Sequence, residues 1–202
     1  MKSGIAASKG YAIGKVKIKS KQEIKVTDAL ITDVEAEKDK LLSAVEESVK
    51  QLEELRDHAA RSMGEQNAEI FDAHIMMLED RNLIDAIILE IEDKHVNALK
   101  ATQQATSHFI DMFEQIEDEY LKERAADIKD ISTRLMTNLA GNKSDFNINE
   151  ENIVVVAHDL TPSDTAQLDK NKVIAFLTDV GGRTSHSAIM ARTLEIPAVV
   201  GM

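Results

Sequence analysis

The sequence contains no cysteine and no tryptophan, and aromatic residues make up only 3% of its 202 positions. Without cysteine the chain can form no disulfide, no thiolate metal site and no thiol nucleophile. With so few aromatic rings, aliphatic side chains must fill the interior, a composition that suits helices. No apolar run approaches the roughly 18 residues of a membrane span, and the start of the chain lacks a signal-peptide core. The sequence therefore predicts a globular cytoplasmic protein without a membrane segment.

Motifs for nucleotide and metal chemistry are also missing. There is no G-x-x-x-x-G-K-[ST] loop, and Gly10 with Gly14 does not form a dinucleotide fingerprint. A di-metal site in a helical bundle requires two Glu-x-x-His pairs, and only Glu92 with His95 has that spacing. We therefore expect neither a cofactor nor a metal ion in this chain.

Negative charge is abundant but unevenly distributed. The net charge of −12 disfavours nucleic acid, whose phosphates require a basic surface. Residues 1–32 carry a net charge of +5, residues 33–140 of −14 and residues 141–202 of −3. The acidic middle block would attract a basic protein partner, but the same charges could serve solubility alone.

The acidic block is also the part with helical periodicity. Apolar residues recur at helical spacing throughout residues 33–140, which contain no proline and one glycine, Gly64. The pattern predicts five helices joined by short polar turns, with a break at Gly64, packed as an antiparallel bundle or helical hairpin.

The flanking segments have the character of strands. Residues 15–19 alternate between polar and apolar, as in a half-solvated strand, whereas residues 153–157 and 173–177 are β-branched runs typical of buried strands. We therefore expect one α/β unit, built from residues 1–32 and 141–202, with the helical subdomain inserted between its two parts. The sequence stops directly after an apolar run, so we expect a fragment of a longer protein.

Residues 178–192 concentrate groups that can handle phosphate. Two adjacent glycines permit a tight turn and close approach of a ligand to the backbone. Thr184 and Ser185 are helix-capping residues followed by good helix formers, which places His186 at a helix N-terminus. There, free amide groups and the helix dipole favour negative charge, and the Arg183 guanidinium suits phosphate oxygens.

A phosphoryl group on His186 would thus be partly neutralised by its surroundings. Phosphoryl transfer depends mostly on positioning and charge stabilisation, and the attacking imidazole must be neutral. A lone histidine after a helix cap would more simply be an ordinary, partly exposed residue. The adjacent glycines, Arg183 and the hydroxyls of Thr184, Ser185 and Ser187 favour a catalytic histidine instead.

The run GGRTSHSAIMAR, from Gly181 to Arg192, resembles the signature of the swivelling phosphohistidine domain of phosphoenolpyruvate-utilising enzymes. That family includes Enzyme I of the bacterial sugar phosphotransferase system, pyruvate phosphate dikinase and phosphoenolpyruvate synthase. Residues 71–80, 119–128 and 159–168 resemble Enzyme I in particular, and the likeness extends over essentially the whole chain.

The resemblance implies an α/β swivelling phosphohistidine domain with an inserted all-α helical bundle subdomain. His186 would take phosphate from phosphoenolpyruvate on Nε2 and pass it to the histidine of the small carrier protein HPr. Thr165 matches a family threonine whose hydroxyl hydrogen-bonds the active histidine and helps to orient it.

The helical insert would be the HPr-docking subdomain. The residues at matching positions in or near the docking face are Glu65, His74, Asp80 and Arg124. Two further positions, Gln66 and Asn82, are neutral where some relatives are expected to carry acids, so individual contacts can differ.

The family's phosphoenolpyruvate and Mg²⁺ site lies in a C-terminal barrel that also mediates dimerisation. We therefore expect this chain to be monomeric and competent only for the HPr half-reaction, and the complete protein to be a homodimer. Two alternatives stay open: a dikinase-type swivelling domain, against which the helical insert argues, and a non-catalytic helical adaptor for a basic protein.

Overall fold

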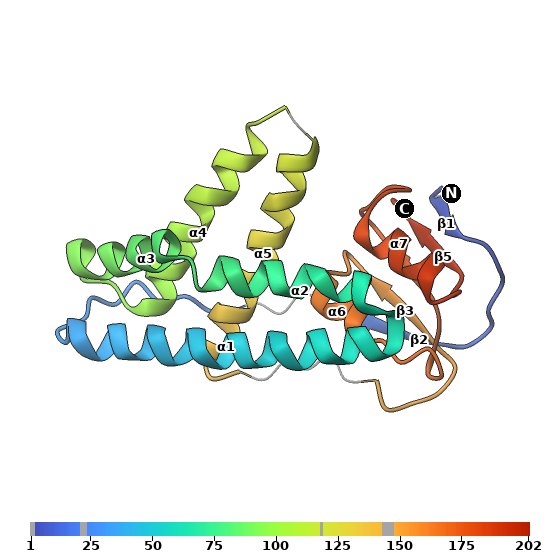
Figure 1. Cartoon of the computed structure of the whole chain (residues 1–202), viewed down its shortest axis with the longest axis horizontal. Coiled ribbons are helices and arrows are strands. Elements are labelled where there is room, and N and C mark those ends of the chain that lie inside the picture. The colour runs from blue at the N-terminus through green and yellow to red at the C-terminus, as the bar shows by residue number, and fades with distance from the viewer. Residues whose placement is uncertain (1–2, 21–23, 118, 143–147) are drawn as a thin grey trace. The chain divides into compact units, whose positions relative to one another are not determined.

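The proline-free middle of the chain forms five helices in the computed structural model, which describes residues 3–20, 24–117, 119–142 and 148–202 (Figure 1). The helices are α1 (Val34–Met63), α2 (Glu65–Leu78), α3 (Arg81–Lys94), α4 (Ala98–Glu114) and α5 (Glu119–Leu139). Gly64, with a φ of 88°, separates α1 from α2 in a conformation that favours glycine. The predicted run of helices and the break at Gly64 are confirmed.

The chain divides into two compact units. One comprises Met1–Gln22, His58–Asn67 and Asp145–Met202, and the other comprises Glu23–Asp57 and Ala68–Ser144. The first is an α/β unit that contains the five strands, and the second contains most of the five helices and no strand among its described residues, which confirms the predicted fold class. The α/β unit also includes residues 58–67, a stretch inside the sequence block expected to be purely helical.

The helical unit is held by aliphatic packing and by capped helix ends. Its fully buried side chains include Leu41, Leu52, Phe71, Leu78, Ile87, Ile91, Ile131 and Leu135. Asp80 caps α3 by accepting a hydrogen bond from the Asn82 amide, and Asn97 caps α4 by accepting from the Lys100 amide. Each buried aliphatic side chain contributes roughly 1.5–3 kcal/mol by leaving water, so packing dominates the stability of this unit.

The α/β unit is a five-stranded sheet with two short helices. Its elements are β1 (Ile5–Ser8), β2 (Lys15–Lys19), β3 (Ile153–Ala157), α6 (Pro162–Ala166), β4 (Val173–Thr178), α7 (His186–Thr193) and β5 (Ala198–Val200). The strand order is β1-β5-β4-β3-β2, with β2 to β5 parallel and β1 antiparallel to β5. Both ends of the chain therefore contribute strands to one sheet.

One face of this sheet packs against α6 and α7. Its core comprises Ala7, Ile153, Val155, Ala157, Leu160, Leu168, Val173, Ala175, Phe176, Ala188, Ala191, Leu194, Ile196, Ala198 and Val200. α7 lies against β1 and β5 (Figure 1). Since the loops that follow β3 and β4 lead into α6 and α7, both helix N-termini lie toward the same edge of the sheet.

The edge strand β2 exposes its apolar side chains and partly buries a lysine. Its apolar residues Val16 and Ile18 are 63% and 71% exposed, whereas the Lys19 side chain is only 23% exposed. Lys19 aligns with Ala157 of β3, so its side chain lies on the sheet face that the helices cover. The predicted alternation of β2 is present, but a lysine faces the helices.

Candidate active site

His186 is the first residue of α7, as the sequence predicts. The preceding residue, Ser185, caps the helix: its hydroxyl accepts a hydrogen bond from the Ala188 amide at 3.4 Å and donates to the Gly182 carbonyl at 2.9 Å. Gly181 has a φ of 111°, and a Cβ there would lie 3.1 Å from Ser185 Oγ. The turn into α7 therefore requires glycine at position 181.

Thr165 of α6 contacts the ring of His186. Its Oγ1 lies 3.1 Å from His186 Nε2, and also donates toward the carbonyls of Pro162 at 3.0 Å and Thr161 at 3.2 Å. The threonine side chain is buried, whereas His186 is half-buried. Because the hydroxyl has one proton and can also accept, it can hold the imidazole in either neutral tautomer.

The remaining predicted side chains of the site differ in accessibility. Arg183 and Thr184 are exposed in the turn that precedes α7. Ser187 is buried, and its Oγ lies 3.1 Å from Ser185 Oγ. The structure thus gives Thr165 a direct contact with the ring and Ser185 the helix cap, while Arg183 and Thr184 are donors open to an incoming group.

Two residues that the sequence analysis did not single out support this site. The carboxylate of Asp164 accepts hydrogen bonds from Thr161 and forms an ion pair with Lys19. The spacing of Thr161 and Asp164 is that of a capping box, which could have drawn attention to Asp164. No local pattern identifies Lys19, because its partner lies 145 residues away in sequence.

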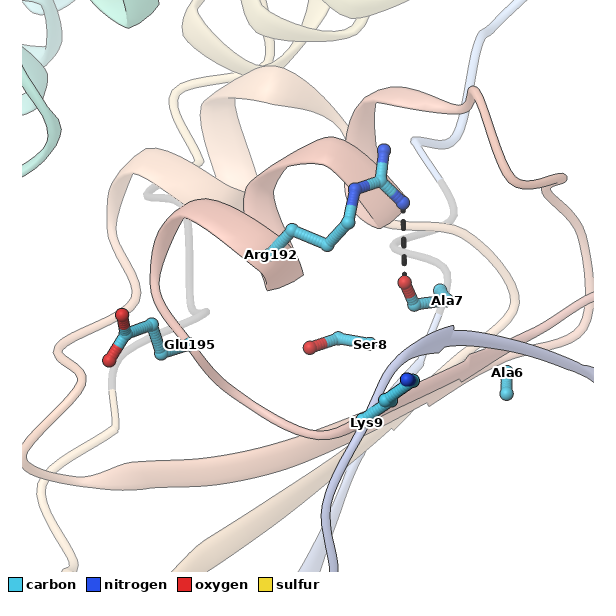
Figure 2. A pocket seen from close by; sticks show the side chains of 6 residues that line it. All are labelled: Ala6, Ala7, Ser8, Lys9, Arg192 and Glu195. Carbon is cyan, nitrogen blue, oxygen red and sulfur yellow. Dashed lines mark hydrogen bonds between the residues drawn. The ribbon is translucent and has the colours of Figure 1, made fainter.

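A surface hollow lies at the other end of α7 (Figure 2). It is lined by Ala6, Ala7, Ser8, Lys9, Arg192 and Glu195. Arg192, in the last turn of α7, donates from Nη1 to the Ala7 carbonyl at 3.2 Å and so ties the helix to β1. Because His186 begins the same helix, the hollow is separate from the candidate active site, and Arg192 has a structural contact there.

The predicted docking residues are found in different environments. Glu65, at the start of α2, and Asp80, the cap of α3, are exposed. Arg124 of α5 is half-buried, with its guanidinium 3.8 Å from the Asp127 carboxylate. The exposed carboxylates are thus accessible to a partner, whereas part of Arg124 is engaged within the helix.

His74, which is expected close to the docking face, has a buried side chain. Its side chain has no exposed area, because it packs beside Phe71 in the helical core. Nε2 lies 3.3 Å from Asp127 Oδ1, and Nδ1 lies 3.6 Å from Asp130 Oδ2. The ring therefore offers no exposed surface to a partner, and it lies between α2 and the two carboxylates of α5.

The described ranges hold neither a metal-binding cluster nor a membrane-spanning helix. In those residues no three His, Cys, Asp or Glu side chains come together in a way that could hold a metal ion. None of the helices in the described part of the chain combines the length and apolar character needed to cross a bilayer.

Comparison with known proteins places these features in a family. The family model for the N-terminal domain of phosphoenolpyruvate-utilising enzymes matches residues 3–124. The family model for the mobile domain of the same enzymes matches residues 149–202. The chain is 49% identical to phosphoenolpyruvate-protein phosphotransferase of Priestia megaterium and 48% identical to that of Enterococcus faecalis. These alignments cover 98% and 100% of the chain but 35% of each relative, so the chain spans about a third of their length.

Solved structures agree with this assignment. An NMR solution structure of Enzyme I is 43% identical, with a TM-score of 0.82 over 100% of this chain and 82% of that one. The N-terminal domain of Enzyme 1 – Nitrogen is 28% identical, with a TM-score of 0.67 over 98% of this chain and 82% of that one. The chain therefore belongs to the family of phosphoenolpyruvate-utilising enzymes and matches the N-terminal domain of Enzyme I.

Proposed function

We propose that this chain carries a phosphoryl group on Nε2 of His186 and exchanges it with the active histidine of HPr. The observation that carries the proposal is the position of this ring: it begins α7, and its Nε2 lies 3.1 Å from Thr165 Oγ1. A phosphoryl group bonded there would meet the free amides of the helix start and the exposed Arg183 guanidinium.

The chemistry of the exchange follows from the ring. The lone pair of Nε2 attacks phosphorus while the P–N bond to the HPr histidine breaks, so Nε2 must be unprotonated and Nδ1 must hold the proton. In that tautomer the Thr165 hydroxyl donates to Nε2. When the P–Nε2 bond forms, the hydroxyl must redirect its proton, and the Pro162 carbonyl at 3.0 Å is an acceptor within reach.

The complete reaction would extend beyond this chain. Relatives named phosphoenolpyruvate-protein phosphotransferase are about three times as long, since the chain covers 35% of their length. We therefore assign the binding of phosphoenolpyruvate and Mg²⁺, and the formation of a homodimer, to the remainder of the protein. The chain alone would be a monomer in the cytoplasm. Its phosphoryl exchange with HPr would be one step of sugar transport.

The helical block of residues 33–140 is the proposed docking surface for HPr. Residues 33–140 carry a net charge of −14, and both Glu65 and Asp80 present exposed carboxylates. Such a surface would steer a basic face of the carrier protein toward the chain and make the association rate fall with salt.

The test is transfer of labelled phosphate from phosphorylated HPr to the chain. We expect acid-labile, base-stable label that returns to HPr when unlabelled carrier is added. His186→Ala should lose the label, whereas His158→Ala, which changes an exposed histidine of the same unit, should keep it. Undiminished label on His186→Ala would disprove the proposal, and HPr binding without transfer would support a non-catalytic adaptor instead.

A further inference from the structure

The helix that carries Thr165, α6, is too short to be stable without contacts to the rest of the α/β unit. α6 has five residues, and a helix of that length is unstable in isolation because the cost of nucleation exceeds the few hydrogen bonds it forms. All five residues, Pro162–Ala166, are buried. The location of α6, and with it the Thr165 hydroxyl, is therefore set by contacts with the rest of the α/β unit.

Asp164 is the centre of the polar contacts of α6. Its Oδ2 accepts hydrogen bonds from the Thr161 amide at 2.8 Å and the Thr161 hydroxyl at 3.0 Å, and it also pairs with Lys19 Nζ. The Asp164 side chain is only 12% exposed. A carboxylate removed from water to that extent is costly unless a cation and hydrogen bonds compensate it, and Lys19 supplies the cation.

Lys19 reaches α6 from the opposite end of the sequence. It is the last residue of β2, and its backbone is fixed by parallel pairing with Ala157 of β3. The ion pair thus fastens α6 to the sheet at the residue directly before Thr165. A shift of Asp164 would move the Thr165 hydroxyl, which lies 3.1 Å from His186 Nε2.

We propose that Lys19 is a positioning residue for His186, acting through Asp164 and Thr165. The ion pair holds α6 where the threonine hydroxyl meets Nε2, and so keeps the ring in the tautomer and orientation that attack requires. This inference rests on the proposed phosphoryl exchange for its kinetic consequence. Its structural consequence, the orientation of the His186 ring, can be measured without HPr.

The experiment compares Lys19→Met with the unchanged chain. We expect the exchange rate at saturating phosphorylated HPr to fall about tenfold, with half-saturation unchanged within about twofold, because positioning affects the chemical step. The ¹⁵N chemical shifts of the His186 ring should change in the same variant. Lys19→Arg, which retains the charge and length, should restore most of the rate and the shifts.

The matched control is Lys15→Met on the same strand. Lys15 pairs with Glu150, but both side chains are well exposed, at 77% and 66%, so this variant should behave like the unchanged chain. Wild-type rate and ring shifts in Lys19→Met would overturn the proposal, as would equal losses in the two variants.

Two further outcomes remain decisive. If Lys19→Met unfolds the α/β unit, Lys19→Met combined with Asp164→Asn removes the unpaired carboxylate and should refold it. That double variant should show altered ring shifts, and native shifts in it would overturn the proposal. If the unchanged chain exchanges no phosphate with HPr, the proposed function fails, and the ring shifts alone decide whether Lys19 positions His186.

Discussion

The helical unit and the α/β unit are assembled from different parts of the sequence. In the helical unit, α1 to α5 follow one another, and their ends are closed by local caps such as Asp80 and Asn97. In the α/β unit, β1 pairs with β5 and Lys19 pairs with Asp164, so residues from both ends of the chain must meet. The candidate active site depends on the unit assembled from both ends of the chain, and most of the acidic charge lies on the unit built from its middle. The following predictions test that separation.

The largest expected effect comes from matched cavities in the two cores. Phe71 of the helical unit and Phe176 of the α/β unit are both 1% exposed. Replacing either with alanine should cost about 3–5 kcal/mol of stability. Phe71→Ala should lower the melting temperature of the helical unit and leave the His186 ring shifts unchanged. Phe176→Ala should change the His186 ring shifts and leave the melting temperature of the helical unit unchanged. Loss of the ring signal in Phe71→Ala would show that the two units are not independent.

A smaller effect is expected at His74. His74→Leu removes a buried ring that lies against Asp127 and Asp130, and should destabilise the helical unit by about 1–3 kcal/mol. Denaturant unfolding monitored by circular dichroism measures this cost. Because the ring is buried, the affinity for HPr of the folded fraction should be unchanged. Unaltered stability together with weaker HPr binding would mean that His74 reaches the partner after all.

Thr165→Val changes the active site while keeping its shape. The variant removes the hydroxyl that lies 3.1 Å from His186 Nε2, and should slow phosphoryl exchange by about tenfold. Thr106→Val is the control in the helical unit, where a buried hydroxyl donates to the Thr102 carbonyl at 2.7 Å. That change should lower stability and leave the exchange rate as it was; equal rates for the two variants would remove Thr165 from the mechanism.

The smallest effect is expected on the acidic surface. Asp80 is both an exposed charge and the cap of α3, so a change to lysine would alter helix stability as well as charge. Asp80→Ser retains a capping hydroxyl and removes the charge alone. We expect the association rate with HPr to fall by about two- to fivefold at low salt, and less at high salt. An association rate that does not respond would place the docking surface elsewhere.

The sequence predicts the local features of this chain well. Helical spacing marks α1 to α5, β-branched runs mark β3 and β4, and capping residues mark the helix that His186 begins. Each of these patterns spans only a few neighbouring residues, so it can be recognised in the sequence without knowledge of the fold. The contact between Thr165 and His186 was predicted from the family resemblance. In the structure Thr165 Oγ1 lies 3.1 Å from His186 Nε2.

The environments of two side chains, His74 and Lys19, were not predicted, because both depend on distant parts of the chain. The resemblance places His74 near a docking face, but whether a helical residue is exposed depends on its neighbours, here Asp127 and Asp130 of α5. The alternation of β2 does not reveal which face of the strand meets the helices. The sequence therefore did not distinguish Lys19 from the solvated lysines of the same strand, although Lys19 pairs with the Asp164 carboxylate, next to Thr165.

The antiparallel pairing of β1 with β5 also has a consequence during synthesis. Ile5 aligns with Val200, so the first strand emerges from the ribosome long before its neighbour exists. At about 5–20 residues per second, the intervening ~190 residues take roughly 10–40 s to be made. The helical unit ends at Ser144, so its residues are all made before β5 and the unit can fold in that interval, while β1 and β2 have no partner strands. The unit that holds the candidate active site is thus the last to form, and the one most exposed to co-translational aggregation.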